Sequence, residues 1–241
     1  MYIFFILFEI FLSGLRYIHL KSKDPNKELK LNIGCGTATS ENWINIDKSL
    51  NIYLSKFSRL KKLMFRLRII SKEVYEARWS GTYLRRDVTR GLPFESNTID
   101  FIYSSHLLEH MINPKALHFL EECYRVLKVG GILRIVVPDL KTMALKYISV
   151  SDDNTIERGI AADLFLTRLG FFFKEDRTFI ERAIGKQNLH HWMYDTDSLS
   201  KRLEIVGFSK IECSTFGKGG LPDLEKIEKR DDGSIFLEAM K

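Results

Sequence analysis

The stretch LNIGCGTATSENWINID, residues 31–47, decides how the rest of the chain is interpreted. One short apolar run ends at Gly34 and Gly36, and a second ends at Asp47, eleven residues after the second glycine. Glycine at a strand end permits positive φ and lets a ligand approach the backbone with no Cβ in the way. A carboxylate at the end of the next strand can accept hydrogen bonds from the adjacent hydroxyls of a ribose. The stretch therefore predicts a nucleoside site beyond the carboxyl ends of two parallel strands.

The same stretch argues against a dinucleotide site. Glycines also end strands for purely steric reasons, and the third glycine of the dinucleotide fingerprint is missing, because Ala38 and Thr39 occupy that position. The carboxylate follows sooner than the roughly 20 residues usual in dinucleotide sites. Any helix between the two runs can then have only a turn or two. A nucleoside ligand without a pyrophosphate fits better.

Further along the chain, short runs rich in Ile and Val alternate with helical patterns. Strands are expected at 29–33, 43–47, 82–88, 99–105, 132–139, 208–216 and 234–240. One helix is expected from Asn113 to Lys128, with Pro114 in its first turn and Gly130 as its stop, and another from 195 or 196 to Gly207. This alternation predicts an α/β fold with a parallel sheet between two layers of helices.

The composition limits the number of domains and the kind of partner. The chain has 241 residues, 45% hydrophobic and 28% charged, which suits one sizeable domain. Its formal net charge of +6 favours anionic partners without choosing among nucleic acid, a phosphorylated substrate and a membrane surface. Cys35, Cys123 and Cys213 form no CxxC pair and have no histidine at metal-ligand spacing. We therefore expect a reduced, cytoplasmic protein without a metal site.

Two segments outside the strand pattern bear on location. The polar linker KSKDPNKE divides an N-terminal apolar helix with its linker, residues 1–28, from the main domain, residues 29–241. Residues 1–20 carry too many polar groups for a membrane span, so they either pack on the domain or lie in a membrane interface. Residues 50–68 form a basic amphipathic helix inserted in the domain. Either its apolar face packs on the core and its basic face is solvated, or its basic face meets an anionic membrane or substrate surface.

Six blocks, in order, resemble the class I S-adenosylmethionine-dependent methyltransferases. The resemblance is closest to the type 11-like enzymes related to ubiquinone and menaquinone methyltransferases, and among them to the branch encoded with bacterial surface-polysaccharide genes. The blocks are LNIGCG, INID, DVTRGLPFESNTIDFIYSSHLLEHM, LEECYRVLKVGGILRIVVPD, HHWMYDTDSLSKRLEIVGF and SIFLEAM. The resemblance implies a doubly wound, mostly parallel, seven-stranded Rossmann-like sheet with its last strand antiparallel. It also implies S-adenosyl-L-methionine as cofactor.

The resemblance also implies which residues bind the cofactor. Gly34, Cys35 and Gly36 would surround its methionine part, Asp47 would bind the ribose, Asp87 and Val88 the adenine, and Ser104 would lie beside the transferred methyl. One position departs from the family pattern. Asn32 stands where many members carry an acid, so the cofactor ammonium would lose a charged partner, although an amide oxygen can still accept its hydrogen bond.

Methyl transfer from a sulfonium needs positioning, and a base helps when the acceptor is a hydroxyl. The candidates for that base are His106, His110, His190 and His191, and the first two are the better placed because they follow the fourth predicted strand. A purely structural role, bracing the turn at Glu109, is the alternative for them. The candidates for acceptor contacts are His190, His191, Trp192 and Tyr194, although aromatic residues in such positions often belong to a core.

These observations favour O-methylation of a sugar or other small-molecule acceptor in surface-polysaccharide biosynthesis. The alternatives are methylation of a lipid-borne acceptor such as a quinone, and a non-catalytic binding protein, for which the Asn32 departure is the one hint. A specific nucleic-acid partner is disfavoured, because no basic, aromatic-interleaved segment occurs apart from residues 50–68. We expect a cytoplasmic protein that contacts the inner face of the membrane through residues 1–20 and 50–68.

Overall fold

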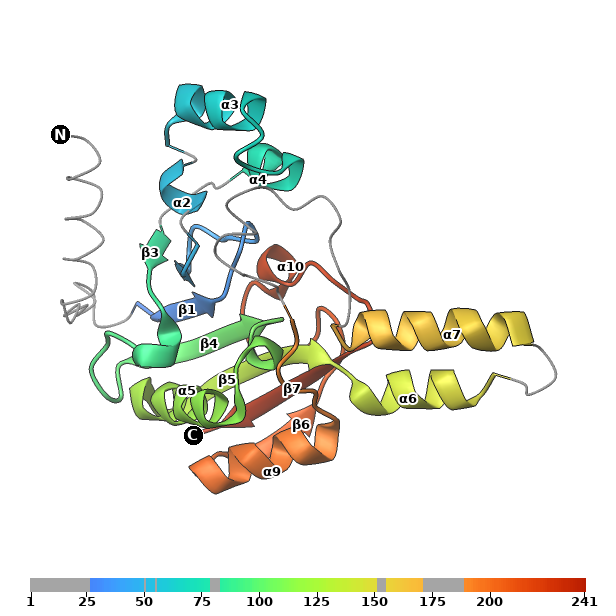
Figure 1. The fold of residues 1–241 in the computed structure, drawn as a ribbon. Coiled ribbons are helices and arrows are strands. Elements are labelled where there is room, and N and C mark those ends of the chain that lie inside the picture. Colours follow the sequence, from blue (N-terminus) through green and yellow to red (C-terminus); the bar gives the residue numbers. More distant parts are fainter. Residues whose placement is uncertain (1–26, 50, 55, 79–82, 151–154, 171–188) are drawn as a thin grey trace.

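The computed structural model describes residues 27–49, 51–54, 56–78, 83–150, 155–170 and 189–241 (Figure 1). The expected N-terminal helix, residues 1–20, lies outside the described residues. The strands are β1 (Lys30–Ile33), β2 (Ile44–Asp47), β3 (Tyr83–Arg85), β4 (Ile99–Ser105), β5 (Leu127–Pro138), β6 (Ser209–Cys213) and β7 (Ser234–Met240). The α-helices are α2 (Asn51–Leu54), α3 (Ser58–Arg66), α4 (Lys72–Glu76), α5 (Asn113–Val126), α6 (Leu140–Ile148), α7 (Thr155–Arg168), α9 (Thr196–Val206) and α10 (Leu224–Ile227), and two 3-10 turns are η1 (Val88–Arg90) and η2 (Leu108–His110).

All seven strands form one sheet in the order β3-β2-β1-β4-β5-β7-β6. Strands β1 to β5 pair in parallel, while β7 is antiparallel to both β5 and β6. The predicted Rossmann-like methyltransferase fold, with its last strand antiparallel, is confirmed. The chain order reverses between β1 and β4, and ligands of open parallel sheets bind beyond the carboxyl ends of the strands at such a point.

The sheet carries a core on each face because side chains alternate along its strands. Ile102, Ile135 and Leu237 belong to the larger core, which is covered by α5 and α9. Their sequence neighbours Tyr103, Val136 and Phe236 belong to a smaller core on the opposite face, together with Trp43 and the apolar side chains of α10. Figure 1 shows α5 and α9 on one side of the sheet and α10 on the other.

Several expected boundaries differ from the structure. Helix α5 ends at Val126, and β5 follows at once from Leu127, so Gly130 does not stop the helix. Gly130 and Gly131 instead lie where β5 shifts register against β4. A Cβ on Gly131 would come within 2.9 Å of the Lys128 carbonyl oxygen. The glycines therefore permit a bulge in a long strand.

The inserted segment and the first connection also differ from expectation. Residues 50–68 do not form one helix but the separate helices α2 and α3. No residue of α3 is buried, and Leu60 and Leu63 are 44% and 53% exposed, so its apolar face does not pack in the core. Between β1 and β2 the chain makes turns and no helix.

A fully buried arginine fastens β5 to β7 and to the loop before α10. Arg134 uses all five N–H donors: it bonds both oxygens of Glu228 at 2.9 Å, Glu238 at 2.8 Å, and the carbonyl oxygens of Thr215 and Lys218. Such a group is tolerated in a core only when it is paired and hydrogen-bonded. This network is structural, because it contains none of the predicted site residues.

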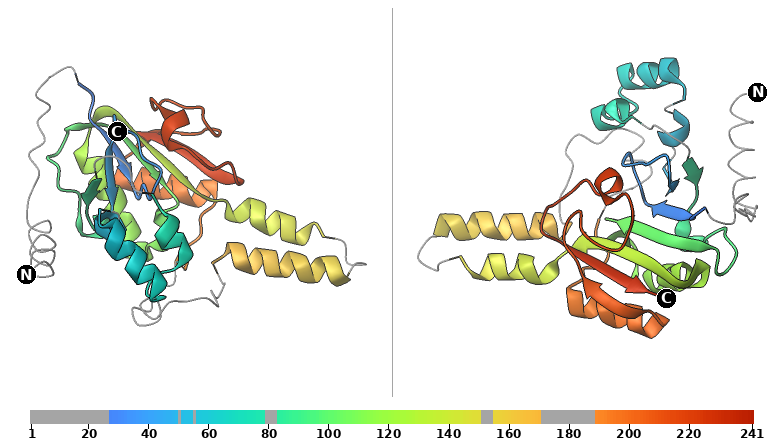
Figure 2. Two further views of the ribbon diagram at one scale, coloured as in Figure 1. Left: turned by 90° about the horizontal axis from the view of Figure 1, so that it is seen from above. Right: turned by 180° about the vertical axis from the view of Figure 1, so that it is seen from behind.

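Helices α6 and α7 pack side by side and project from the sheet, as the views in Figures 1 and 2 agree. They leave large apolar side chains partly exposed: Leu145, Tyr147, Ile148, Ile156, Ile160, Leu164 and Leu166. None of the described helices has the length and apolar character needed to cross a membrane.

Candidate functional site

The glycine turn after β1 lies at the carboxyl edge of the sheet, as the sequence predicted. Gly34 and Gly36 both have positive φ, 69° and 50°. A Cβ on Gly36 would meet nothing within 4 Å, so the space over this residue is open. A Cβ on Gly34 would lie 3.0 Å from the side chain of Leu107, which follows β4. The turn therefore presents open backbone on one side and touches the end of β4 on the other.

Asp47 ends β2 and holds this turn in place. Its carboxylate accepts hydrogen bonds from the Gly36 amide at 3.0 Å and from the Ser49 amide at 2.8 Å. A carboxylate has about four acceptor positions, so two stay available to hydroxyls of a ligand. Cys35, between the glycines, is buried, and that burial, followed by the charge of Asp47, raises the pKa of its thiol. Its side chain is a neutral packing group, and only its backbone can contact a ligand.

The end of the third parallel strand adds a second carboxylate. Asp87 caps η1 and accepts hydrogen bonds from the amide and the hydroxyl of Thr89 at 3.2 and 2.7 Å. Partial burial acts to raise the pKa of Asp87, but the Thr89 bonds and nearby cations outweigh burial and lower the pKa overall. Val88 is buried at the start of η1. In strand order, Gly34, Asp47 and Asp87 thus stand at the ends of three neighbouring strands.

Asn32 lies inside this edge, 1% exposed, and is paired with Asn45 on β2. Its amide nitrogen donates to the Ala38 carbonyl at 2.8 Å and to Asn45 Oδ1 at 3.1 Å. Both amide protons are thereby committed to the turn, and the Asn32 oxygen is the group left to accept a hydrogen bond. The residue at the position that departs from the family pattern therefore supports the glycine turn directly.

The end of β4 carries a histidine in an uncommon conformation. His106 has φ of 49°, the left-handed region that non-glycine residues seldom adopt. Its amide donates to the Val136 carbonyl, and its Nδ1 lies 3.2 Å from Glu109 Oε1. Its Nε2 is buried without a hydrogen-bond partner and lies 3.7 Å from Asp232. Ser104, also on β4, is 2% exposed, and its hydroxyl has no partner either. Orphaned polar atoms at a strand end are a mark of a binding site.

Two further histidines, His110 and His190, lie in contact with each other next to Glu109. His110 Nδ1 is 3.1 Å from the Leu189 carbonyl oxygen, and the His110 and His190 rings meet edge to face at 5.0 Å. Burial lowers the pKa of His190, although the charge of Glu109 opposes this in part. The Glu109 carbonyl oxygen accepts from the amide of His191 at 2.7 Å. The fold thus brings residue 190 to the turn after β4.

The other predicted acceptor residues differ in exposure. His191 and Trp192 are exposed, whereas Tyr194 is fully buried and its ring offers no open face. The Arg202 guanidinium lies over the rings of Trp192 and Tyr194, at 5.5 and 5.3 Å. Burial raises the pKa of Tyr194 to about 12. Tyr194 therefore anchors this segment to the core, and Trp192 lies at the surface.

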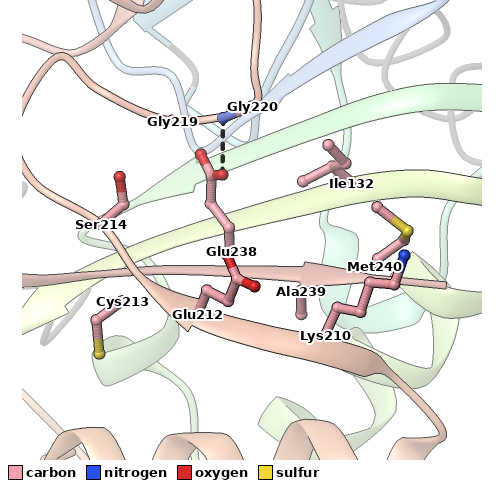
Figure 3. A pocket seen from close by; sticks show the side chains of 10 residues that line it. All are labelled: Ile132, Lys210, Glu212, Cys213, Ser214, Gly219, Gly220, Glu238, Ala239 and Met240. Atoms are coloured by element: carbon pink, nitrogen blue, oxygen red, sulfur yellow. Dashed lines mark hydrogen bonds between the residues drawn. The ribbon is translucent and has the colours of Figure 1, made fainter.

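One pocket of about 330 Å³ lies away from this edge (Figure 3). It is lined by residues of β5, β6, β7 and the loop before α10, including Lys210, Cys213 and Glu238, and Glu238 accepts a hydrogen bond from Gly220 at 2.8 Å. None of the predicted site residues lines it. The predicted site residues thus lie at the carboxyl edge and not in this pocket.

Comparison with known proteins gives one domain match. Residues 31–135 match the family model described as Methyltransferase domain. An uncharacterized protein of Saccharomyces cerevisiae is 27% identical over 139 residues, 57% of this chain and 15% of the yeast protein. The chain therefore spans a small part of that relative's length.

Two solved structures are similar at low identity. A SAM-dependent methyltransferase of Methanosarcina mazei has a TM-score of 0.48 and 16% identity, with 93% of this chain and 99% of that chain covered. A SAM-dependent methyltransferase of Thermotoga maritima has a TM-score of 0.46 and 16% identity, with 99% and 96% covered.

The strand order is that of a Rossmann-like fold, and residues 31–135, less than half of the chain, match a methyltransferase domain, so S-adenosylmethionine is the cofactor against which the residues present are tested. The match contains the glycine turn, both strand-end carboxylates, Ser104 and the turn from His106 to His110. The segment from His190 to Tyr194 lies outside it. The residues present fit the cofactor, because Gly36 leaves open space that a Cβ would fill and the Ser104 hydroxyl lacks a partner.

Proposed function

We propose that this protein transfers a methyl group from S-adenosylmethionine to a hydroxyl of a small-molecule acceptor, a sugar of a surface-polysaccharide precursor. One observation carries the proposal. At a single edge of the sheet, the open glycine turn with its two strand-end carboxylates lies beside a partly buried histidine that is paired with a buried glutamate. Binding groups and a proton acceptor are thereby adjacent.

The chain's own residues would bind and orient both reactants. The cofactor supplies a methyl group on a positively charged sulfur, which is already activated for displacement. Gly36 leaves its backbone open to the methionine part of the cofactor, and Asp47 keeps acceptor positions for ribose hydroxyls. Asp87 is held ionised by its Thr89 bonds and would accept from the adenine amino group.

His106 is the better placed of the two candidate bases. When its Nδ1 donates to Glu109 Oε1, Nε2 of the neutral ring carries the lone pair, with the Asp232 carboxylate 3.7 Å away. That nitrogen has no partner and can take a proton from a hydroxyl within hydrogen-bond reach. His110 also has a free Nε2, since its Nδ1 faces a carbonyl oxygen, but no carboxylate orients its ring through a hydrogen bond.

Calorimetry with S-adenosylhomocysteine tests the cofactor half of the proposal, and we expect one site per chain. A well-folded protein that gives no heat would refute it. The acceptor half is tested by transfer of a labelled methyl group to sugar nucleotides and to lipid-linked sugars. Binding of the cofactor without transfer to any acceptor class would favour the non-catalytic alternative.

A lipid-borne acceptor is a second candidate, favoured by α3. Leu60 and Leu63 of α3, and Leu67 directly after it, are 44 to 61% exposed, and the opposite side of α3 is basic. Such a helix binds an anionic membrane surface through buried apolar area and attraction to headgroups. The protein would then act in the cytoplasm at the inner face of the membrane, with residues 1–20 as a further contact.

Flotation with anionic and neutral vesicles separates the two candidates. Reversing basic charges on α3, at Arg59 and Lys62, should weaken binding to anionic vesicles, whereas Lys201→Glu on α9 is the matched control. A full chain that stays with the soluble fraction in low salt would leave only the soluble acceptor. A chain without residues 1–28 should still fold, if residues 29–241 are the methyltransferase domain.

A further inference from the structure

A cluster of three potential metal ligands forms where η2 meets the segment before α9. Glu109, His110 and His190 each offer one ligand atom, and these atoms all lie within 4.8 Å of one another. The two parts of the cluster are about eighty residues apart in the sequence. They are held together by the His191 and Trp192 amides, which donate to the Glu109 carbonyl oxygen at 2.7 and 3.2 Å. These backbone contacts, together with the His110 Nδ1 contact to the Leu189 carbonyl oxygen, fix the cluster.

The carboxylate of Glu109 is buried with one oxygen unpaired. The side chain is 1% exposed, and Oε1 has His106 Nδ1 at 3.2 Å. Oε2 has no hydrogen-bond partner. A buried carboxylate oxygen without a donor costs free energy, and a bound cation would remove that cost. His106 would then orient the ligand from behind, as hydrogen-bonded neighbours do around metal sites.

Both imidazoles have a nitrogen free for an ion. His110 Nδ1 faces the Leu189 carbonyl oxygen at 3.1 Å, so it must carry the proton and donate it. Its Nε2 therefore bears the lone pair. This arrangement, one ring nitrogen donating to a backbone carbonyl and the other free, is the usual one for histidines that bind metals. His190 Nδ1 is buried and has no partner.

We propose that Glu109, His110 and His190 bind one divalent transition-metal ion of the zinc type. Two neutral imidazoles and one carboxylate are the ligand set of open zinc sites and of two-histidine, one-carboxylate iron sites. Mg²⁺ and Ca²⁺ prefer sites made of oxygen ligands. The site lies at the same sheet edge as the glycine turn, because Leu107 of the same turn lies within contact of Gly34. Metal binding in itself does not depend on the proposed methyl transfer.

The test uses the full chain after chelator treatment and dialysis. Zn²⁺ is added in competition with a chromophoric chelator, and Co²⁺ is added separately to record its visible absorption. We expect one ion per chain, and a rise in the unfolding temperature when Zn²⁺ is present, because the ion binds the folded state. His110→Ala, His190→Ala and Glu109→Gln should each weaken Zn²⁺ binding by about 100-fold or more and abolish the stabilisation.

His118→Ala is the matched control. His118 lies on α5 beside Glu121, with a half-exposed side chain and outside the cluster, so its loss should leave binding unchanged. His106→Gln should weaken binding about 10- to 100-fold by releasing Glu109. The proposal would be overturned if the number of Zn²⁺ ions bound per chain fell as much in His118→Ala as in the three ligand variants. It would also be overturned if the folded ligand variants kept the wild-type affinity for Zn²⁺, and the residues would then form a hydrogen-bonded cluster without an ion. Calorimetry with S-adenosylhomocysteine on the same samples reports separately on the cofactor site.

Discussion

Replacing Asp47 by alanine should weaken cofactor binding and stability by separate amounts. The carboxylate accepts from the Gly36 and Ser49 amides at 3.0 and 2.8 Å. Both bonds are partly exposed, so water can replace the lost acceptor, and we expect about 1 kcal/mol of unfolding free energy for each. Loss of the charged acceptor for ribose hydroxyls should cost a further 1 to 3 kcal/mol of binding, roughly 5- to 150-fold in the dissociation constant.

Two further variants separate these contributions. Asp47→Asn keeps one acceptor oxygen, which can serve only one of the two amides, so both losses should be intermediate. Asp100→Ala is the control, because Asp100 lies at the start of β4, at the opposite edge of the sheet. Its carboxylate accepts hydrogen bonds from the Leu29 amide and from Lys128. This variant should lower stability by about 1 to 2 kcal/mol and leave affinity unchanged.

Urea unfolding gives the stabilities, and calorimetry with S-adenosylhomocysteine gives the affinities. A folded Asp47→Ala protein with wild-type affinity would refute the ribose role. Equal losses of affinity in Asp47→Ala and Asp100→Ala would show that any loss of stability weakens binding, and that the carboxylate has no specific contact.

Four other variants test the site and its frame. His106→Ala should lower the methyl-transfer rate by roughly 10² to 10⁴ with affinity for S-adenosylhomocysteine nearly unchanged; full turnover would exclude it as the base. Gly36→Ala should cost about 1 to 2 kcal/mol of stability, since φ is 50°, and should also block the cofactor, as calorimetry would show. Arg134→Met should cost about 3 to 5 kcal/mol in urea unfolding, because it leaves buried carboxylates unpaired; a loss below about 1 kcal/mol would contradict this. Hydrogen bonds from Lys226 and Lys30 lower the pKa of Asp223 from 3.8 to about 2, so its contribution to stability is present above pH 4 and disappears as the pH falls to 2. The difference in unfolding free energy between the wild type and Asp223→Asn should shrink across that window, and a constant difference would be evidence against this linkage.

The elements that the sequence predicted best are those with a local cause. β4 and β7 have the expected bounds, because apolar side chains fill both faces of a central sheet. Helix α9 has the expected ends because both caps are local: Asp195 accepts from the Ser198 amide, and Gly207 has φ of 111°. Such signals act over four residues and need no knowledge of the rest of the fold.

Other features depend on pairing across the sheet, which the sequence does not reveal. Gly130 resembles a helix stop, but the register of β5 against β4 makes it part of a bulge. Asn32 resembles a weakened ligand for an ammonium group, yet its pairing with Asn45 in the parallel register commits its amide protons. The sequence therefore predicts that Asn32 lies at this edge of the sheet, but it does not predict that its amide group bonds Asn45.

The cluster at Glu109 shows the same limit in the case of a binding site. Sequence rules for metal sites rely on several ligands spaced a few residues apart, and the adjacent pair Glu109 and His110 does not match such a pattern. His190 joins them only because residues 190 to 194 lie along the ends of β4 and β5, where Tyr194 pairs with Asp139. A ligand set split in this way is visible in the fold alone.

At the carboxyl edge of the sheet, two groups of strands carry different sets of candidate site residues. The ends of β1, β2 and β3 carry the glycine turn and the two carboxylates, while the ends of β4 and β5 hold the histidines and Glu109. Leu107 connects the groups, since its side chain fills the space beside Gly34. A shift of the turn after β4 would therefore disturb the glycine turn, and the reverse also holds. The left-handed backbone of His106 fixes that turn, so a change of its φ would move Leu107 and, through Leu107, Gly34.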